Sequence, residues 1–354
     1  MDLSAARRML LGPCPWLVDT YSRDQGKLRV LGWALPEYET PQNFTFTVNG
    51  VPAKDLELGL YSPDVARVFP FFCSSMNARF RLVHELTEQD LDLGYAAVDY
   101  CNAFTLEPIY NWHTIYIPLK SFDIREFPYD DQLQRTQGNT SRERFIIYGY
   151  TTYRRIESIL QIYFRKSLNS FSRILDWGCG CGRVSRHLTD SVPRLHDCDI
   201  DPLNIRYCSE NIAGGKFDVV ALMPPTSYPD GYFDLIIGIS VFTHLTGKAA
   251  QAWAGEIARI IQPGGVALMT VHGNSAIARF KEDSKLIEIF GTTFLDGDLD
   301  PALEKIISDK AYYRSTYHLA SRVRNDFSKY FTVVDIIKAS NALIQDFIVL
   351  LKAL

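Results

Sequence analysis

The junction at residues 174–183 constrains the possible folds of this chain more than any other feature. Its sequence, Ile-Leu-Asp-Trp-Gly-Cys-Gly-Cys-Gly-Arg, is typical of a buried strand that enters a glycine-rich turn and then a helix. Such turns bring backbone N–H groups close to a ligand. A dinucleotide fingerprint, G-x-G-x-x-G, would need a glycine where Arg183 stands. Because the carboxylate of Asp176 at the strand end would repel a pyrophosphate, the turn favours a cationic ligand.

From about residue 142 onward, helical periods alternate with short apolar runs, which indicates βαβ units and a mostly parallel sheet. The predicted leading helix covers 156–168. Helical spacing of apolar residues predicts another helix that ends before the Pro-Gly-Gly at 263–265. The predicted strands are 174–176, 194–199, 217–220, 235–239, 266–272, 332–338 and 346–351. Residues 273–317 exceed a simple crossover and are predicted to form a lid over the C-terminal edge of the sheet.

The first hundred residues have a different pattern. Residues 44–48 alternate apolar and polar side chains before Asn49-Gly50, a strong hairpin signal. Further short apolar runs at 67–72, 78–82, 95–100 and 114–117 predict an all-β module of the sandwich or small-barrel type. We therefore predict a β-rich module at 1–120, a linker and leading helix at 121–172, and an α/β domain at 173–354.

Composition excludes several classes of function. The chain has 354 residues, enough for two domains, and a net charge of -4, which disfavours nucleic acid and anionic membranes as partners. No apolar run reaches the length of about 18 residues that crosses a bilayer, and the apolar stretch after Arg7-Arg8 is too short for a signal peptide. The seven cysteines lack the spacing of a disulfide framework, so we expect reduced thiols and a cytoplasmic protein.

The glycine loop, taken together with an acid downstream, resembles motif I of the class I S-adenosylmethionine-dependent methyltransferases. The resemblance extends from about residue 148 to the C-terminus and implies a Rossmann-like, seven-stranded sheet with helices on both faces. S-adenosylmethionine is the implied cofactor. Asp176 then faces its amino-acid end, and Asp199, 23 positions later, matches the acid that binds both ribose hydroxyls. The loop residues that pass close to the cofactor are Gly178, Cys179, Gly180 and Gly182.

The resemblance also assigns the remaining landmarks. The run 229–237 looks like the entry to strand four, so that Gly238 and Ile239 present backbone groups to the cofactor. Many members carry an acid or amide after strand three, whereas this chain has Val-Ala-Leu-Met at 220–223, so we expect Ile200 and Leu222 to form apolar walls for adenine. Two further candidates each have two interpretations. Arg183 binds either the cofactor carboxylate or an acid of its own fold. Tyr148 lies at the methionine end of the cofactor or packs in the core.

Methyl transfer requires mainly that the nucleophile is held against the methyl group, and a hydroxyl acceptor benefits from a general base. Three histidines fall near predicted strand ends: His272, His244 and His318. We predict His272 as the base, because packing under a helix is an equally good interpretation of His244. The tyrosine-rich run 312–318 is either an aromatic wall for the acceptor or part of the core. The four cysteines at 179–208 lack C-x₂-C pairs, and no metal is expected.

The sequence therefore predicts a methyltransferase (EC 2.1.1.-) that O-methylates a sugar, a glycan or a small metabolite. The prediction of the acceptor class is based on residues 32–36 and 46–50, which are similar to modules attached to glycan-modifying enzymes. Two alternatives remain open, namely an inactive methyltransferase-like binding protein and a nicotinamide-dependent oxidoreductase. The oligomeric state also stays open, and a homo-oligomer is one of the alternatives.

Overall fold

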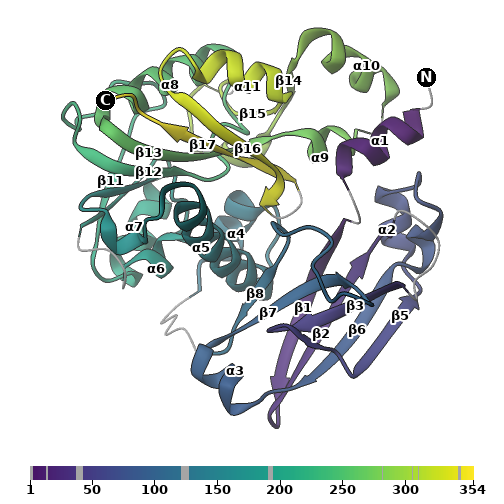
Figure 1. Ribbon diagram of the computed structural model, residues 1–354. Helices are drawn as coiled ribbons and strands as arrows, with labels where there is room; N and C mark the ends of the chain where they lie inside the picture. The colour runs from purple at the N-terminus through teal and green to yellow at the C-terminus, as the bar shows by residue number, and fades with distance from the viewer. Residues whose placement is uncertain are drawn as a thin grey trace.

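A computed structural model describes residues 3–12, 15–36, 43–120, 127–189, 194–280, 282–304, 306–309, 311–341 and 344–354. The chain folds into an antiparallel β part and an α/β part, which lie side by side in Figure 1. The predicted fold class is therefore confirmed. The predicted linker includes residues 121–126, which lie outside the described residues, and the predicted domain boundaries stay a prediction.

The N-terminal part is a sandwich of two four-stranded antiparallel sheets. One sheet has the order β1 (Trp16–Asp24), β2 (Lys27–Ala34), β6 (Arg79–Glu85) and β5 (Asp55–Leu60). The other has the order β4 (Val51–Pro52), β3 (Phe44–Val48), β7 (Tyr95–Asn102) and β8 (Ile115–Pro118). Alternate side chains of both sheets, such as Phe46 and Phe80, meet in a common core. The hairpin turn at Asn49-Gly50 has positive φ at both residues, as predicted.

The predicted apolar run at 67–72 is not a strand. It begins in helix α2 (Pro63–Val68), which starts with proline at its first turn, and it leads to the 3₁₀-helix η2 (Cys73–Asn77). Phe69 and Phe72 are buried in a small separate core, which explains the apolar run without a strand. Two further helices, α1 (Leu3–Leu11) and α3 (Glu88–Leu93), were not predicted.

The C-terminal part is built on a nine-stranded sheet. Seven of its strands match the predicted ones in the order β11 (Gly215–Val219), β10 (Leu195–Asp199), β9 (Ile174–Trp177), β12 (Phe233–Gly238), β13 (Ile261–His272), β17 (Gln345–Leu351) and β16 (Thr332–Asn341). The first five are parallel, and β17 is antiparallel to both β13 and β16. β16 and β17 thus form an antiparallel pair at the end of the sheet.

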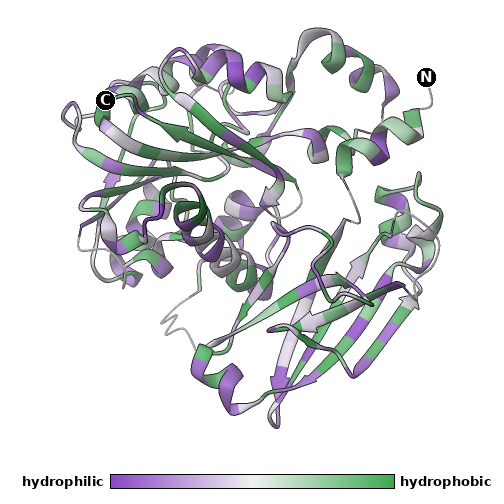
Figure 2. Cartoon of the chain, in the orientation of Figure 1, coloured by the Kyte–Doolittle hydropathy of each residue, from purple (hydrophilic) through white to green (hydrophobic). Residues whose placement is uncertain are grey.

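Helices cover both faces of this sheet. Successive residues of its strands enter two different cores, so that Leu175 packs with α8 (Gly247–Ile260) and Ile174 packs with α5 (Arg142–Phe164). The central strands are accordingly hydrophobic along their length, whereas those of the sandwich alternate, as Figure 2 shows. The other helices are α4 (Asp130–Gln137), η3 (Leu168–Ser170), α6 (Ser185–Leu188), α7 (Pro202–Asn211), α9 (Asn274–Ile277), α10 (Asp283–Thr292), η4 (Pro301–Leu303) and α11 (Ala320–Phe327).

Part of the segment predicted as a lid extends the sheet instead. Strand β15 (Arg314–His318) pairs in parallel with the end of β13, and β14 (Phe294–Leu299) pairs with β15, so the sheet has nine strands rather than seven. Residues 281, 305 and 310 of this segment lie outside the described residues. The acids and the glycine in β14 hide its strand character in the sequence.

Helix α5 joins the two parts. It begins at Ser141, which caps it, and is therefore longer than the predicted helix at 156–168. Ile147 lies in the core of the sandwich, and Ile156 lies in the core beneath the α/β sheet. The buried Arg155 donates a hydrogen bond to the carbonyl of Thr114 at 3.0 Å, which ties α5 to the chain just before β8.

Candidate functional site

The turn after β9 forms the floor of the site. Gly178, Gly180 and Gly182 have φ of +74°, +56° and +72°, in the left-handed region that favours glycine. A Cβ on Gly178 would lie 2.4 Å from Cγ2 of Val241, and one on Gly182 would lie 2.2 Å from Cδ1 of Ile212 in the turn after α7. The glycines therefore allow both the turn and the close approach of its neighbours.

Asp199 lies at the end of β10, beside this turn. Its Oδ2 accepts a hydrogen bond from the backbone N–H of Gly180 at 2.8 Å, and its Oδ1 accepts one from the N–H of Asp201 at 2.8 Å. Burial nevertheless raises the pKa of Asp199 to about 6. Each carboxylate oxygen keeps a second lone pair, so the group can accept further hydrogen bonds from a ligand.

Asp176, on β9, is also buried and accepts a hydrogen bond from the hydroxyl of Ser185 at 2.8 Å. Burial raises its pKa, and the nearby charge of Asp199 adds to this effect, whereas Ser185 and Arg183 oppose it. Asp197 lies beside Asp176 on the neighbouring strand and is fully buried, and burial raises its pKa well above the usual value. This buried acidic cluster favours a cationic ligand.

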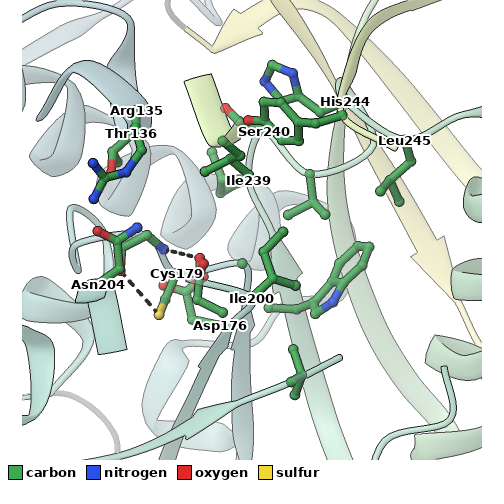
Figure 3. Close-up of a pocket in the computed structure, with 18 of the residues that line it drawn as sticks. Arg135, Thr136, Asp176, Cys179, Ile200, Asn204, Ile239, Ser240, His244 and Leu245 are labelled. Atoms are coloured by element: carbon green, nitrogen blue, oxygen red, sulfur yellow. Dashed lines mark hydrogen bonds between the residues drawn. The ribbon is translucent and has the colours of Figure 1, made fainter. Parts of the chain in front are cut away.

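Asp176, Asp199, Gly178 and Gly180 line a pocket of about 960 Å³, a volume that includes space open to solvent. Its lining includes eight of the predicted cofactor residues, which are Asp176, Gly178, Cys179, Gly180, Arg183, Asp199, Ile200 and Ile239. Figure 3 shows Arg135 and Thr136 on one side of this pocket and His244 and Leu245 on the other.

Four predicted cofactor residues do not line the pocket. The hydroxyl of Tyr148 donates a hydrogen bond to the carbonyl of Val18 at 2.9 Å, so this side chain is directed toward the sandwich. Gly182 packs against α7 and the turn after it, and Gly238 lies against the side chains of Met269 and Trp177. Both glycines serve close packing.

The fourth is Leu222. Its carbonyl accepts hydrogen bonds from Nε1 of Trp253, at 2.9 Å, and from the hydroxyl of Tyr312, and its side chain packs into the core beside α8. Val220, two residues earlier, lines the pocket in its place, together with Ile200. Val220 therefore takes the place of Leu222 in the pocket lining.

Of the three predicted histidines, only His244 lines the pocket. His272 does not reach it: its Nδ1 donates a hydrogen bond to the carbonyl of Thr316 at 3.2 Å, and its ring stacks on Tyr317. His318 is buried against Phe294, away from the pocket. Burial lowers the pKa of His272 to about 3 and that of His318 to about 4. The preference for His272 over His244 is thus opposed by the geometry.

His244 follows β12 and stacks on Tyr313, with ring centroids 4.2 Å apart and planes at 11°. Burial lowers its pKa to about 4, so the imidazole is neutral at pH 7. Its Nδ1 lies 3.6 Å from Oδ2 of Asp300. Oδ1 of Asp300 accepts a hydrogen bond from the N–H of Ala302 at 3.0 Å, which fixes the carboxylate and leaves Oδ2 for the histidine.

Several lining residues were not predicted from the sequence. Arg135 and Thr136 come from α4, and a Cβ on Gly180 would lie 2.9 Å from Cγ2 of Thr136. Ser240 has φ of +63°, which is rare for a residue other than glycine and typical of functional sites. Its Oγ accepts a hydrogen bond from Nε2 of Gln345 at 2.7 Å. No local motif marks these positions, because only the tertiary fold brings α4 and β17 to the loop.

The site offers fixed groups for both charges of an amino-acid moiety. Arg183 is close enough to Asp176 to lower its pKa, yet its Nε is buried and has no hydrogen-bond partner among the residues that the structure describes. Together with the buried acids and the glycine turn, this arrangement fits S-adenosylmethionine, which carries a sulfonium, an ammonium and a carboxylate. When bound, this cofactor supplies an electrophilic methyl group.

The cysteines near the turn act as weak hydrogen-bond donors. Sγ of Cys208 donates to the carbonyl of Gly180 at 3.4 Å, and Sγ of Cys181 donates to Oγ1 of Thr136 at 3.3 Å. Burial raises the pKa of Cys181 to about 12. Within the described ranges, no group of three or more His, Cys, Asp or Glu side chains could hold a metal ion. Likewise, no helix there is long and apolar enough to span a bilayer.

The glycine turn on β9, the acid at the end of β10 and the strand order define a class I S-adenosylmethionine-dependent methyltransferase domain in the C-terminal part of the chain. Residues 175–269 match the protein family described as a methyltransferase domain. The predicted resemblance and the predicted cofactor are thereby confirmed.

Two curated proteins are similar to part of the chain. One is tRNA (carboxymethyluridine(34)-5-O)-methyltransferase from Arabidopsis thaliana, 34% identical over 125 residues, which are 35% of this chain and 28% of that protein. The other is 2-methyl-6-phytyl-1,4-hydroquinone methyltransferase from Synechocystis sp., 33% identical over 97 residues, or 26% of this chain and 30% of that protein. The matches span less than a third of either relative.

Among solved structures, magnesium protoporphyrin IX methyltransferase (ChlM) from Synechocystis PCC 6803 with bound SAH is similar at 15% identity and a TM-score of 0.43. The match covers 63% of this chain and 94% of that one.

Proposed function

We propose that this methyltransferase transfers the methyl group to a hydroxyl of a sugar, a glycan or a small metabolite. The observation that carries the proposal is the presence of His244 in the same pocket as the glycine turn. A hydroxyl nucleophile must lose its proton, and a neutral imidazole next to the pocket can accept it. Burial lowers the pKa of His244 to about 4, which keeps the imidazole neutral at physiological pH and also makes it a weaker base than an exposed histidine.

The assignment of cofactor contacts follows the charges of the pocket. Asp199 accepts hydrogen bonds from the ribose hydroxyls, Asp176 faces the ammonium end, and Arg183 binds the carboxylate through its unpartnered Nε. Ile200 and Val220 form the apolar walls for adenine. The glycine turn lets the backbone approach the cofactor without side chains in between.

Asp300 supports His244 as a positioning residue. If Nδ1–H of the imidazole is directed at Oδ2 of Asp300, Nε2 carries the lone pair that takes the acceptor proton. The separation of 3.6 Å is longer than a hydrogen bond, and such contacts often shorten only when the substrates are bound.

The pocket also suits a ring-shaped acceptor. Tyr312 and Tyr313 line it, and aromatic faces bind sugars and flat metabolites by stacking. A nucleic-acid acceptor is disfavoured by the net charge of -4, although one relative bears a tRNA methyltransferase name. Six described cysteines are free thiols, which supports a cytoplasmic location.

The test is a screen of sugars, glycans, metabolites and tRNA for release of S-adenosylhomocysteine, with mass spectrometry of the products. For the acceptor found, His244→Asn should lower kcat by roughly 100-fold or more and leave cofactor affinity within about twofold. His196→Asn is the matched control, because His196 lies on β10 outside the pocket lining. An unchanged kcat in His244→Asn refutes the base, and cofactor binding without any methylated acceptor supports the alternative of an inactive binding protein.

A further inference from the structure

Arg279 is a half-buried cation without an acidic partner among the described residues. It follows α9 and lies over the ring of Phe69 from the sandwich part, with its guanidinium carbon 5.1 Å from the ring centroid. Its Nε and Nη2 are buried and have no hydrogen-bond partner in the described ranges. Burial lowers the pKa of Arg279 to about 10, so the side chain stays charged at neutral pH. An unpaired buried charge destabilises a fold, which suggests that it is kept for a ligand.

The backbone around Arg279 is held in place by α1. Nη1 of Arg7 donates hydrogen bonds to the carbonyls of Ala278, at 2.9 Å, and of Phe280, on either side of Arg279. Arg7 also pairs with Asp283 at 2.8 Å. The position of Arg279 is thus fixed by contacts that leave its own Nε and Nη2 without a hydrogen-bond partner among the described residues.

Arg279 forms the wall shared by two pockets. One lies between α1, α2 and α10, and the other lies along β14 and β15 and reaches Asp300. Three of the acids that line these pockets have cationic partners: Asp283 pairs with Arg7 at 2.8 Å, and Asp298 and Glu282 pair with Lys285 at 3.0 and 3.8 Å, whereas Asp300 lies 3.6 Å from the neutral His244. None of the described acids lies within ion-pair distance of Arg279, so its charge is available to a ligand.

The pocket along β14 and β15 connects this cation with the proposed base. Asp300 lines it, and the same carboxylate lies beside Nδ1 of His244, which lines the cofactor pocket. A row of rings runs in the same direction: Tyr313 stacks on His244, His244 contacts His272, and His272 stacks on Tyr317 of the second pocket. A ligand in the second pocket would therefore extend from Arg279 to Asp300, beside the proposed base.

We propose that Arg279 binds an oxyanion, a carboxylate or a phosphate, carried by the methyl acceptor. The two unpartnered nitrogens on one guanidinium suit the two oxygens of such a group. This inference depends on the proposed function for the acceptor, whereas the binding of an oxyanion by Arg279 is measurable without it.

The first experiment uses inorganic phosphate as the probe. We expect Tm to rise with phosphate at constant ionic strength in the natural protein, and we expect about tenfold weaker binding or more in Arg279→Met. Arg279→Lys should keep part of the response. Arg173→Met is the matched control, because Arg173 lies over the ring of Tyr232 at 4.6 Å, away from these pockets. An equal response in Arg279→Met, or none in the natural protein, overturns the proposal.

Stability separates a binding role from a packing role. Because Arg279→Met removes an unpaired buried charge and keeps the length of the side chain, its Tm without phosphate should equal or exceed that of the natural protein. A marked fall in Tm with an unchanged phosphate response would show a structural role and refute the site.

The second experiment concerns the acceptor. Arg279→Met should raise KM for an acidic acceptor about tenfold or more and leave KM for its neutral amide unchanged. Equal effects on both refute the assignment to the acceptor. Binding of S-adenosylmethionine should be the same in Arg279→Met and the natural protein. If the natural protein does not bind the cofactor, the proposed function fails, and the phosphate result still decides the oxyanion site.

Discussion

The carboxylate of Asp199 provides the most direct test of the cofactor site. It joins the end of β10 to the glycine turn through Gly180 and to the start of α7 through Asp201, with both hydrogen bonds at 2.8 Å. Asp199→Asn keeps the shape of the side chain and one acceptor oxygen but removes the charge. Asp199→Ala removes both oxygens and leaves two buried N–H groups without partners.

The expected loss follows from these contacts. Hydrogen bonds to a charged group contribute about 1.5–3 kcal/mol, so either variant should weaken cofactor binding by about 10- to 150-fold. In Asp199→Ala, each unpaired N–H should also lower the free energy of unfolding by about 1–3 kcal/mol. Asp199→Asn should therefore separate affinity from stability better than Asp199→Ala.

Isothermal titration with S-adenosylmethionine, together with Tm, measures both effects. The matched control is Asp218→Asn, because Asp218 lies on the neighbouring strand β11 and does not line the pocket. If Asp199→Asn is folded and its Kd stays within about twofold of the natural value, the carboxylate does not contact the cofactor and the reasoning fails.

Two further predictions concern pH and the turn. Burial holds the pKa of Asp199 near 6 and also raises the pKa of Asp176. Because the ionised carboxylates bind the cation and the ribose hydroxyls, cofactor affinity should fall roughly tenfold from pH 7.5 to pH 5. A constant Kd over this range would contradict this prediction. Gly178→Ala should destabilise the protein by about 1–3 kcal/mol and weaken cofactor binding, because its Cβ would meet Val241 at a φ of +74°. Gly138→Ala is the control, because Gly138 has a similar φ of +75° but open space around it. Thermal and urea unfolding of the two variants therefore isolate the steric effect. Equal losses of stability in both variants would rule out the clash.

The sheet of the α/β part was predictable because short apolar runs and glycine turns are local signals. The seven predicted strands exist, and the third predicted strand differs only by a shift of its bounds toward Gly215. The run at 67–72 was misjudged because an apolar stretch alone does not distinguish a strand from helical packing, and here Pro63 starts a helix. Strand β14 was missed because its acids and its glycine are unusual in strands.

The residues of the candidate site were likewise predictable only where a local sequence signal marks them. The residues of the glycine turn and Asp199 belong to one βαβ unit, where spacing along the chain fixes their proximity. We predicted His272 rather than His244 because packing under a helix is an equally good interpretation of His244, and only the assembled fold shows that His244 lines the pocket. Arg279 carries no local signal, because its lack of partners is a property of the assembled fold.

Helix α5 has a consequence for the energetics of the whole chain. Its 23 residues span about 34 Å, and opposite ends of this one element complete the cores of the sandwich and of the α/β sheet. Between these ends, a Cβ on Gly149 would lie 2.4 Å from the carbonyl oxygen of Arg183, so α5 also touches the glycine turn. The two parts therefore share one cooperative unit. A cavity cut into the sandwich near Ile147 would lower the melting temperature of the methyltransferase fold as well as its own.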